Sequence, residues 1–248
     1  MDQKPIDAIL FDLDNTLIRT AYAGRVAIEK TSDLLRKTPG LDDVIIGHIN
    51  EKFKQKLQRE TFDPASSHGT IDEVRVDHWE QSIREAAGSC TRSLASQCYN
   101  LWKSSRLELL SLSPEIRALL QDLRTTYKLL LLTNGESQTQ REKIAATMCE
   151  GFFDAVVVGG DYPEQKPALS IFSHCFAVLG TEAKRCVIVG DSLDTDIQGG
   201  FDAGLRATVW IKNAGATQDM CAAKPDYTIS TVLDLPGILE QIHTTDLM

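Results

Sequence analysis

The feature that most constrains the fold is an alternation of short apolar runs with amphipathic stretches over residues 114–242. Near-continuous apolar runs are typical of strands that are buried on both faces, and helical spacing between them indicates crossover connections. The expected strands are residues 128–133, 154–158, 185–190, 207–211 and 227–229, and the expected helices are residues 114–125, 136–148, 168–179, 195–203 and 232–242. This order predicts an α/β fold with a doubly wound, Rossmann-like parallel sheet.

A further apolar run, Ala8–Phe11, stands apart near the start of the chain and leads into Asp12 and Asp14. Alternate side chains of an extended backbone lie on the same side, so the two carboxylates face one region. They repel each other unless a cation or a proton lies between them. Mg²⁺, a hard ion with oxygen ligands, suits such a pair beside a phosphate. The alternative is that both are ordinary loop acids or helix caps.

Residues 19–110 separate this first strand from the alternating part and have a helical pattern with almost no strand signal. Helices are expected over residues 21–36, 44–60, 71–87 and 94–110, with loops at residues 38–40 and 63–69. We therefore expect an all-helical domain, residues 19–110, inserted into a core domain formed by residues 1–18 and 111–248. Three aromatic residues of the insert are expected to pack between its helices: Trp79, Tyr99 and Trp102.

Charge and cysteine content narrow the classes of partner. The chain has a formal net charge of −9 and no basic stripe, which makes it a poor binder of nucleic acid or of an anionic membrane. Its six cysteines form no C-x-x-C pair and lack zinc-site spacing, so we expect free thiols in a reducing compartment. Residues 1–5 do not resemble a signal peptide and no apolar run has membrane-spanning length, so we expect a cytoplasmic protein.

Four loops carry polar groups close to the carboxyl ends of the expected strands, where open parallel sheets bind ligands. They are residues 12–16, 133–135, 164–167 and 190–196. In the second loop, Asn134-Gly135 is typical of a hairpin, but helical spacing follows it. We therefore expect a helix N-terminus there, at which the Thr133 hydroxyl and backbone N–H groups form an anion site.

The third and fourth loops supply charge of both signs. Pro167 is expected to restrict Lys166 to an extended conformation and to start the next helix. The fourth loop has several acids, one of which could complete a metal site begun by Asp12. Together the loops supply a nucleophile, a second acid, a phosphate cradle, a countercharge and a metal site. Phosphoryl transfer through a carboxylate requires these groups.

The same stretches resemble the four motifs of the haloacid dehalogenase superfamily. The matches are D-x-D-x-T at residues 12–16, T/S-N-G at residues 133–135, K-P at residues 166–167 and G-D-x-x-x-x-D at residues 190–196. The resemblance implies that residues 19–110 are a helical cap of the family's first type. The second acid, Asp14, implies a Mg²⁺-dependent phosphatase or phosphomutase and not a dehalogenase.

The resemblance also implies roles for individual residues. Asp12 would be the nucleophile that forms an aspartyl-phosphate, and Asp14 would protonate the leaving oxygen and then activate the attacking water. Phosphate would be bound by Leu13, Asp14, Thr133, Asn134 and Lys166. Mg²⁺ would be bound by Asp12, Asp191 and the backbone carbonyl of Asp14. Asp196 would orient Lys166 or a water on the metal.

Longer stretches, which include some of the motifs and extend beyond them, narrow the resemblance to a branch that dephosphorylates a nine-carbon acidic sugar phosphate in sialic acid synthesis. They are residues 11–18, 129–135, 138–144, 153–160, 196–200 and 207–211 in the core, and residues 78–80 and 101–104 in the cap. Arg75 and Arg106 are candidates to bind the carboxylate of such a sugar. The alternative for each is a position on a solvated helix face.

Other functions remain open at this point. A nucleotidase, a phosphoglycolate phosphatase or a β-phosphoglucomutase-like mutase would have the same core chemistry, so the cap must discriminate among them. A non-catalytic binding module on the same fold is the alternative of a different class. Such a module has no chemical need for both Asp12 and Asp14.

Overall fold

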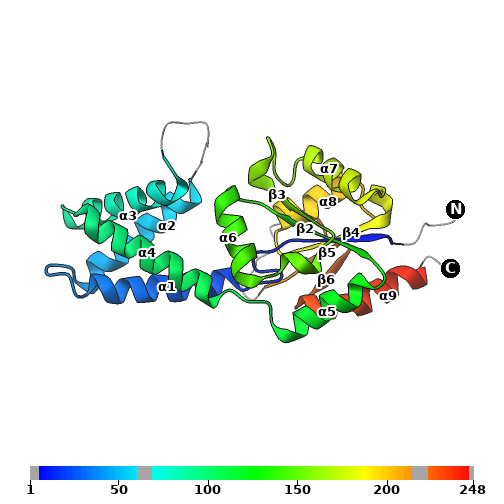
Figure 1. Cartoon of the computed structure of the whole chain (residues 1–248), viewed down its shortest axis with the longest axis horizontal. Helices are drawn as coiled ribbons and strands as arrows, with labels where there is room; N and C mark the ends of the chain where they lie inside the picture. Colours follow the sequence, from blue (N-terminus) through cyan, green and yellow to red (C-terminus); the bar gives the residue numbers. More distant parts are fainter. Residues whose placement is uncertain (1–5, 61–68, 214–222, 246–248) are drawn as a thin grey trace. The chain divides into compact units, whose positions relative to one another are not determined.

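The computed structural model describes residues 6–60, 69–213 and 223–245, which form the two compact units seen in Figure 1. One unit comprises Met1–Arg19 and Ser111–Met248, and the other comprises Thr20–Leu110. Residues 1–5, Cys221 and most of the expected loop at 63–69 lie outside the described residues. Within the described ranges, no helix combines the length and the apolar character needed to cross a membrane.

The first unit is built on a parallel sheet of six strands in the order β3-β2-β1-β4-β5-β6. Its strands are β1 (Ala8–Phe11), β2 (Lys128–Thr133), β3 (Ala155–Val158), β4 (Cys186–Gly190), β5 (Ala207–Ile211) and β6 (Tyr227–Ile229). Its helices are α5 (Pro114–Arg124), α6 (Ser137–Thr147), α7 (Leu169–Leu179), α8 (Gln198–Asp202) and α9 (Leu235–Thr245). The α/β fold predicted from the alternating pattern is confirmed.

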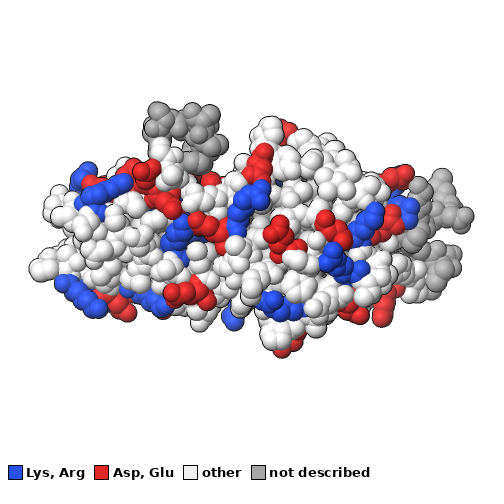
Figure 2. All heavy atoms as spheres, in the orientation of Figure 1, with Lys and Arg blue, Asp and Glu red and all other residues white. Residues whose placement is uncertain are grey.

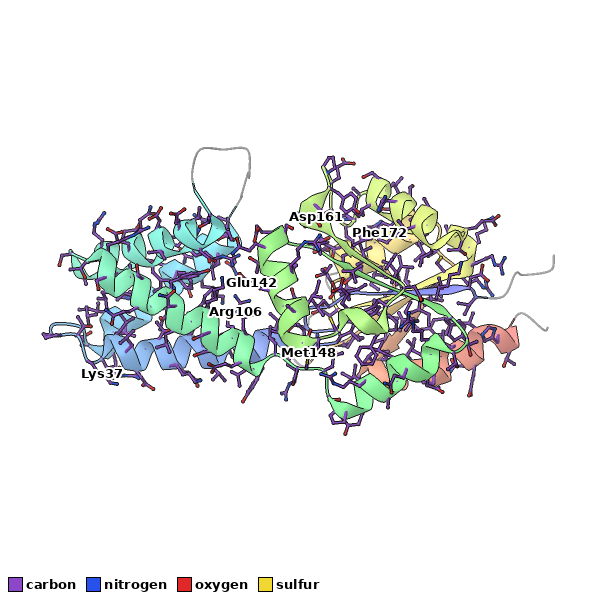
Figure 3. All side chains as sticks on the ribbon, viewed as in Figure 1. Lys37, Arg106, Glu142, Met148, Asp161 and Phe172 are labelled. Atoms are coloured by element: carbon purple, nitrogen blue, oxygen red, sulfur yellow. The ribbon has the colours of Figure 1, made fainter. Side chains whose placement is uncertain are left out.

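Both faces of the sheet are covered, which explains why the central strands β1 and β4 are buried at every position. Alternate residues of β1, β2 and β4 pack with α7 in one cluster, in which Phe172 of α7 faces the sheet (Figure 3). Helices α5 and α9 lie on the opposite side of the sheet from α7 and α8 (Figure 1). In the centre of the sheet, β1 pairs with β2 on one side and with β4 on the other. The loops after these three strands therefore converge at one edge.

The second unit consists of α1 (Thr20–Leu35), α2 (Asp43–Gln58), α3 (Ile71–Ala87) and α4 (Arg92–Leu109). Local signals define its helix ends: Thr70 and Glu73 form a capping box at the start of α3, and Gly88 ends that helix with a φ of 83°. The rings of Phe53 and Trp79 stack with centroids 3.9 Å apart, and Trp102 meets Phe53 edge-on at 5.2 Å. The expected aromatic core between these helices is confirmed.

Short elements were not predicted from the sequence, and several predicted helix boundaries differ from the structure, among them the starts of α8 and α9, which lie three residues later than expected. The unpredicted elements are the 3₁₀ turns η1 (Glu150–Phe152), η2 (Gly159–Asp161), η3 (Ala183–Arg185) and η5 (Val232–Asp234) and the π turn η4 (Leu193–Ile197). Three to five residues are too few for a period to appear in the sequence. Pro167 does not start the next helix, because α7 begins at Leu169 after an uncapped Ala168.

The stack at Phe53 makes a stability prediction for the helical unit. Phe53 is fully buried, so Phe53→Ala should lower the free energy of unfolding by about 3–5 kcal/mol through lost burial and a residual cavity. Guanidinium unfolding followed by tryptophan fluorescence measures this loss. Val44 is 67% exposed on the same helix, so Val44→Ala should change the free energy by less than about 0.5 kcal/mol. Equal effects of the two substitutions would contradict the packing described.

Candidate active site

The expected site residues converge at the carboxyl edge of the sheet. Asp12 follows β1 directly and its backbone N–H donates to Val189 O of β4 at 3.0 Å, which extends the pairing by one residue. Its side chain is 10% exposed. Thr133 ends β2, and Asp191 follows β4. Residues far apart in the chain therefore meet because the parallel order brings these strand ends together.

Lys166 lies at the centre of this group and is almost completely buried. Its Nζ donates to Asp12 Oδ1 at 2.8 Å, to Asp196 Oδ1 at 2.7 Å and to Leu132 O at 2.7 Å. An ammonium has three donors, and all three are used here. Burial opposes the charge, but Asp12 and Asp196 outweigh burial and raise the pKa of Lys166 above its ordinary value. Lys166 is therefore a fixed cation between two carboxylates.

The loop after β4 holds Asp196 in place. The π turn η4 brings Asp196 back toward its own start, where Asp196 Oδ2 accepts from Ser192 N at 3.1 Å. A Cβ on Gly190 would lie 2.2 Å from Asp196 Oδ2, so only a glycine leaves room for this carboxylate. With one oxygen on Lys166 and the other on Ser192, the Asp196 side chain is fully engaged.

Three acids bring carboxylate oxygens close together at this edge. Asp12, Asp191 and Asp196 each offer a carboxylate oxygen, and these oxygens all lie within 4.8 Å of one another. Burial, followed by repulsion from Asp196, raises the pKa of Asp191 to about 6. Burial also raises the pKa of Asp12 to about 7, against the opposing effect of Lys166. Clustered oxygen donors whose ionisation is opposed by burial and mutual repulsion fit a hard divalent cation, which would favour their charged forms.

The side chain of Asp14 points to a different set of partners. Lys143 Nζ of α6 lies 2.6 Å from Asp14 Oδ2, and Gln140 Nε2 donates to the same oxygen at 3.3 Å. The sequence analysis did not assign Lys143 or Gln140 to the site. The available signal was the buried face of α6, which carries Gln140, Lys143, Ile144 and Thr147 at helical spacing. Buried polar side chains need hydrogen-bond partners, and Lys143 and Gln140 both contact Asp14.

The loop after β2 holds the Lys166 backbone in place and also carries hydrogen-bond donors. The Asn134 amide accepts from Lys166 N at 3.0 Å and donates to Lys166 O at 2.8 Å, so this side chain clamps the Lys166 backbone. Thr133 Oγ1 is buried and donates to Gln140 Oε1 at 3.2 Å. The hairpin alternative is excluded because α6 begins two residues after Gly135. In the first loop, the Leu13 side chain is buried, and buried Thr16 Oγ1 has no hydrogen-bond partner among the residues that the structure describes.

The two cap arginines have different surroundings within the helical unit. Arg75 is buried, and its Nη2 donates to Glu60 Oε1 at 2.8 Å. The alternative that Arg75 lies on a solvated helix face is therefore wrong. Arg106 is half-buried, with its guanidinium carbon 4.3 Å from the centre of the Trp102 ring. It lines a cavity of about 560 Å³ together with Arg25 and Lys54.

Comparison with known proteins extends these observations. A family model described as haloacid dehalogenase-like hydrolase matches residues 6–204. N-acylneuraminate-9-phosphatase of Rattus norvegicus is 47% identical over 244 residues, which cover 98% of this chain and 97% of that protein. Pyrimidine 5'-nucleotidase YjjG of Escherichia coli (strain K12) is 31% identical over 178 residues, or 69% of this chain and 75% of that protein.

A solved structure has the same fold. The HAD-hydrolase YfnB from Bacillus subtilis, whose crystal structure was determined bound to magnesium, aligns with a TM-score of 0.70. The alignment covers 95% of this chain and 99% of that chain at 24% sequence identity. This likeness supports the arrangement of a parallel sheet with helices inserted after its first strand.

The buried Arg75–Glu60 pair yields a stability prediction. Removing one partner leaves the other charge buried, so Arg75→Met should lower the free energy of unfolding by about 3–5 kcal/mol at pH 7. Arg84 pairs with Glu80 on the surface of the same helix, at 2.5 Å with 56% of the arginine side chain exposed. Arg84→Met should therefore cost only about 0.5 kcal/mol by denaturant unfolding. Equal losses would contradict the burial of the Arg75 pair.

The same pair predicts a pH dependence. Burial opposes ionisation of Glu60, but His78 and Arg75 outweigh burial and hold the pKa of this carboxyl below its ordinary value of 4.5. A lowered folded-state pKa contributes stability above the ordinary value, and this contribution is lost as the pH falls through the folded-state pKa. The difference in unfolding free energy between wild type and Arg75→Met should therefore narrow in acid. A difference that stays constant from pH 7 to pH 3 would refute the linkage to Glu60.

Proposed function

Because the chain belongs to the haloacid dehalogenase-like hydrolases, we propose that it hydrolyses N-acylneuraminate 9-phosphate to N-acylneuraminate and phosphate. The observation that carries this proposal is the 47% identity to the rat N-acylneuraminate-9-phosphatase, which extends over both the core and the helical insert. The cluster of Asp12, Lys166 and Asp196 supports the chemistry, since a buried carboxylate oriented by a fixed cation suits a nucleophile. The enzyme would act in sialic acid biosynthesis.

In the first step, Asp12 attacks phosphorus and forms an aspartyl-phosphate. Lys166 orients the nucleophile through its contact with Oδ1 and places positive charge beside the incoming phosphate. Asp196 holds the Lys166 ammonium in place and does not itself touch the substrate. The Asn134 amide fixes the Lys166 backbone, which keeps the ammonium aimed at Asp12.

Asp14 transfers the protons of the reaction. Its side chain is 27% exposed, so it can reach a bound substrate while it stays in contact with Lys143. It donates a proton to the leaving sugar oxygen and then accepts one from the water that hydrolyses the aspartyl-phosphate. Phosphate oxygens are bound by Thr133 and by backbone N–H groups of Leu13, Asp14 and Asn134.

Mg²⁺ is the proposed cofactor, with Asp12, Asp191 and the backbone carbonyl of Asp14 as its ligands. When bound, it would neutralise phosphate charge as a Lewis acid. Asn213 Nδ2 lies 3.3 Å from Asp191 Oδ2 and helps to orient this carboxylate.

The helical unit is the proposed substrate-selecting domain. We assign residues 19–110 to a cap and residues 1–18 and 111–248 to the catalytic core. Arg106 is the better candidate to bind the carboxylate of the sugar, because Arg75 already pairs with the buried carboxylate of Glu60. The five cysteines in the described part of the chain are free thiols, which supports a cytoplasmic location.

A nucleotidase is the second candidate function, supported by the 31% identity to the E. coli pyrimidine 5'-nucleotidase. A panel assay of phosphate release with Mg²⁺ separates the two candidates. The substrates are N-acetylneuraminate 9-phosphate, nucleoside monophosphates, phosphoglycolate and hexose phosphates. We expect the highest kcat/KM for the nine-carbon sugar phosphate, and loss of activity with EDTA. A preference for nucleotides would refute the proposed substrate but would agree with the proposed aspartyl-phosphate mechanism.

Replacement of the nucleophile tests the chemistry itself. Asp12→Asn should lower kcat by on the order of a thousandfold or more on every substrate of the panel, because no aspartyl-phosphate can form. The fold should survive, since the amide still accepts a hydrogen bond from Lys166; circular dichroism checks this. Retained turnover in a folded Asp12→Asn protein would refute the assignment of Asp12.

Substrate recognition by Arg106 is tested by comparing two substrates. Arg106→Ala should raise KM about tenfold or more for N-acetylneuraminate 9-phosphate, which corresponds to the loss of a charge-assisted contact. KM for 4-nitrophenyl phosphate, which has no carboxylate, should not change. Lys37, at the opposite end of the helical unit from Arg106 in Figure 3, offers the control variant Lys37→Ala. Equal effects of Arg106→Ala on both substrates would count against this role.

A further inference from the structure

Helix α6 buries charged and polar side chains where a helix of this fold would be expected to bury apolar ones. Lys143 is 5% exposed and Gln140 is 4% exposed, and both lie on the face that also carries Ile144 and Thr147. Figure 3 labels Glu142, which neighbours Lys143 in the same helix. A buried ammonium costs several kcal/mol unless it is paired, so the position of Lys143 calls for a specific reason.

The contacts of this face lead to Asp14. Lys143 Nζ lies 2.6 Å from Asp14 Oδ2, and Gln140 Nε2 donates to the same oxygen at 3.3 Å. The other end of the Gln140 amide accepts from Thr133 Oγ1 at 3.2 Å. One chain of contacts therefore joins Thr133, Gln140, Asp14 and Lys143.

This arrangement restricts the Asp14 carboxylate to one orientation. Asp14 is more exposed than Lys143, with 27% of its side chain accessible against 6%. Lys143 is therefore the more buried partner of the pair, on the inward face of α6, and Asp14 is the more accessible one. Two donors that converge on the same carboxylate oxygen from a rigid helix fix the rotamer of a side chain that would otherwise move in solvent.

We propose that Lys143 is a positioning residue for Asp14, and that Gln140 links the same carboxylate to the buried hydroxyl of Thr133. The proposal rests on the proposed function, in which Asp14 transfers protons. In the first step the bond from Asp12 to phosphorus forms, the bond from phosphorus to the leaving oxygen breaks, and the Asp14 proton moves to that oxygen. In the second step a water oxygen bonds to phosphorus, the acyl-phosphate bond breaks, and a water proton moves to Asp14.

The two steps respond differently to a misplaced Asp14 when the leaving group is varied. A sugar alkoxide must be protonated as it leaves, so loss of Asp14 positioning slows the first step with a sugar phosphate. 4-Nitrophenolate leaves without a proton, so the first step with 4-nitrophenyl phosphate does not depend on Asp14. The second step depends on Asp14 with either substrate. A lysine that contacted phosphate directly would instead affect the first step with both substrates.

The test is stopped-flow and steady-state kinetics of Lys143→Met. With N-acetylneuraminate 9-phosphate, kcat should fall about 100-fold without a burst of product, as expected for lost acid–base catalysis. With 4-nitrophenyl phosphate, one equivalent of nitrophenolate should appear at the wild-type rate, followed by slow turnover. Equal slowing of the first step with both substrates would overturn the proposal, and so would wild-type behaviour with both.

Control variants separate positioning from structure. Lys143→Arg keeps a cation and should recover part of the lost activity on the sugar phosphate. Lys184 is exposed in η3, before β4 and so at the opposite edge of the sheet from Asp14, and Lys184→Met should leave both reactions unchanged. If Lys143→Met does not fold, Lys143→Gln carries the same test, with the same burst expected and the same outcomes against it.

The design separates failure of this proposal from failure of the proposed function. If the wild-type enzyme hydrolyses another alkyl phosphate and not N-acylneuraminate 9-phosphate, the substrate proposal fails and that alkyl phosphate replaces it in the burst experiment. If the wild type hydrolyses no phosphate ester, the positioning role is tested by comparing the Asp14 side chain in crystal structures of the wild type and Lys143→Met. The Asp14 carboxylate should leave its wild-type position in the variant, and an unchanged Asp14 would overturn the positioning role.

Discussion

The arrangement of the candidate site depends on one interaction, the buried Lys166 ammonium between Asp12 and Asp196. Each of the three groups would be costly to bury alone, and together they satisfy one another. The interaction joins the loops after β1 and β4 to the segment that precedes α7. It also uses Leu132 O, so the end of β2 is joined to the same point. The parallel sheet brings these groups near one another, and the charge pairing sets their geometry.

Much of the fold follows from local patterns in the chain. The strands appear within one residue of the expected positions and the helices within three, because a strand buried on both faces leaves a clear apolar run. The convergence of Asp12, Thr133, Lys166 and Asp191 follows from the rule that parallel strands carry ligand sites at their carboxyl ends. The family model matches residues 6–204, a range that contains all four loops, and this agrees with their interpretation as motifs of the family.

Contacts that depend on which face of a helix is buried could not be predicted from the sequence. Lys143 and Gln140 look like ordinary polar residues of a surface helix until the sheet is in place, and only then does Asp14 become their partner. The same holds for Arg75, whose partner Glu60 is 15 residues earlier in the chain. Periodicity identifies a helix, but charge on its buried face is explained only by the tertiary partner.

The central claim is that Asp12 becomes phosphorylated during turnover. Acid quench of the enzyme while it hydrolyses N-acetylneuraminate 9-phosphate, followed by borohydride reduction, converts an aspartyl-phosphate to homoserine. Mass spectrometry of the peptide that contains Asp12 then reports the site directly. We expect homoserine at position 12 and unmodified aspartate at position 14. An unmodified Asp12 in enzyme that is turning over, or homoserine at another acid, would contradict the claim.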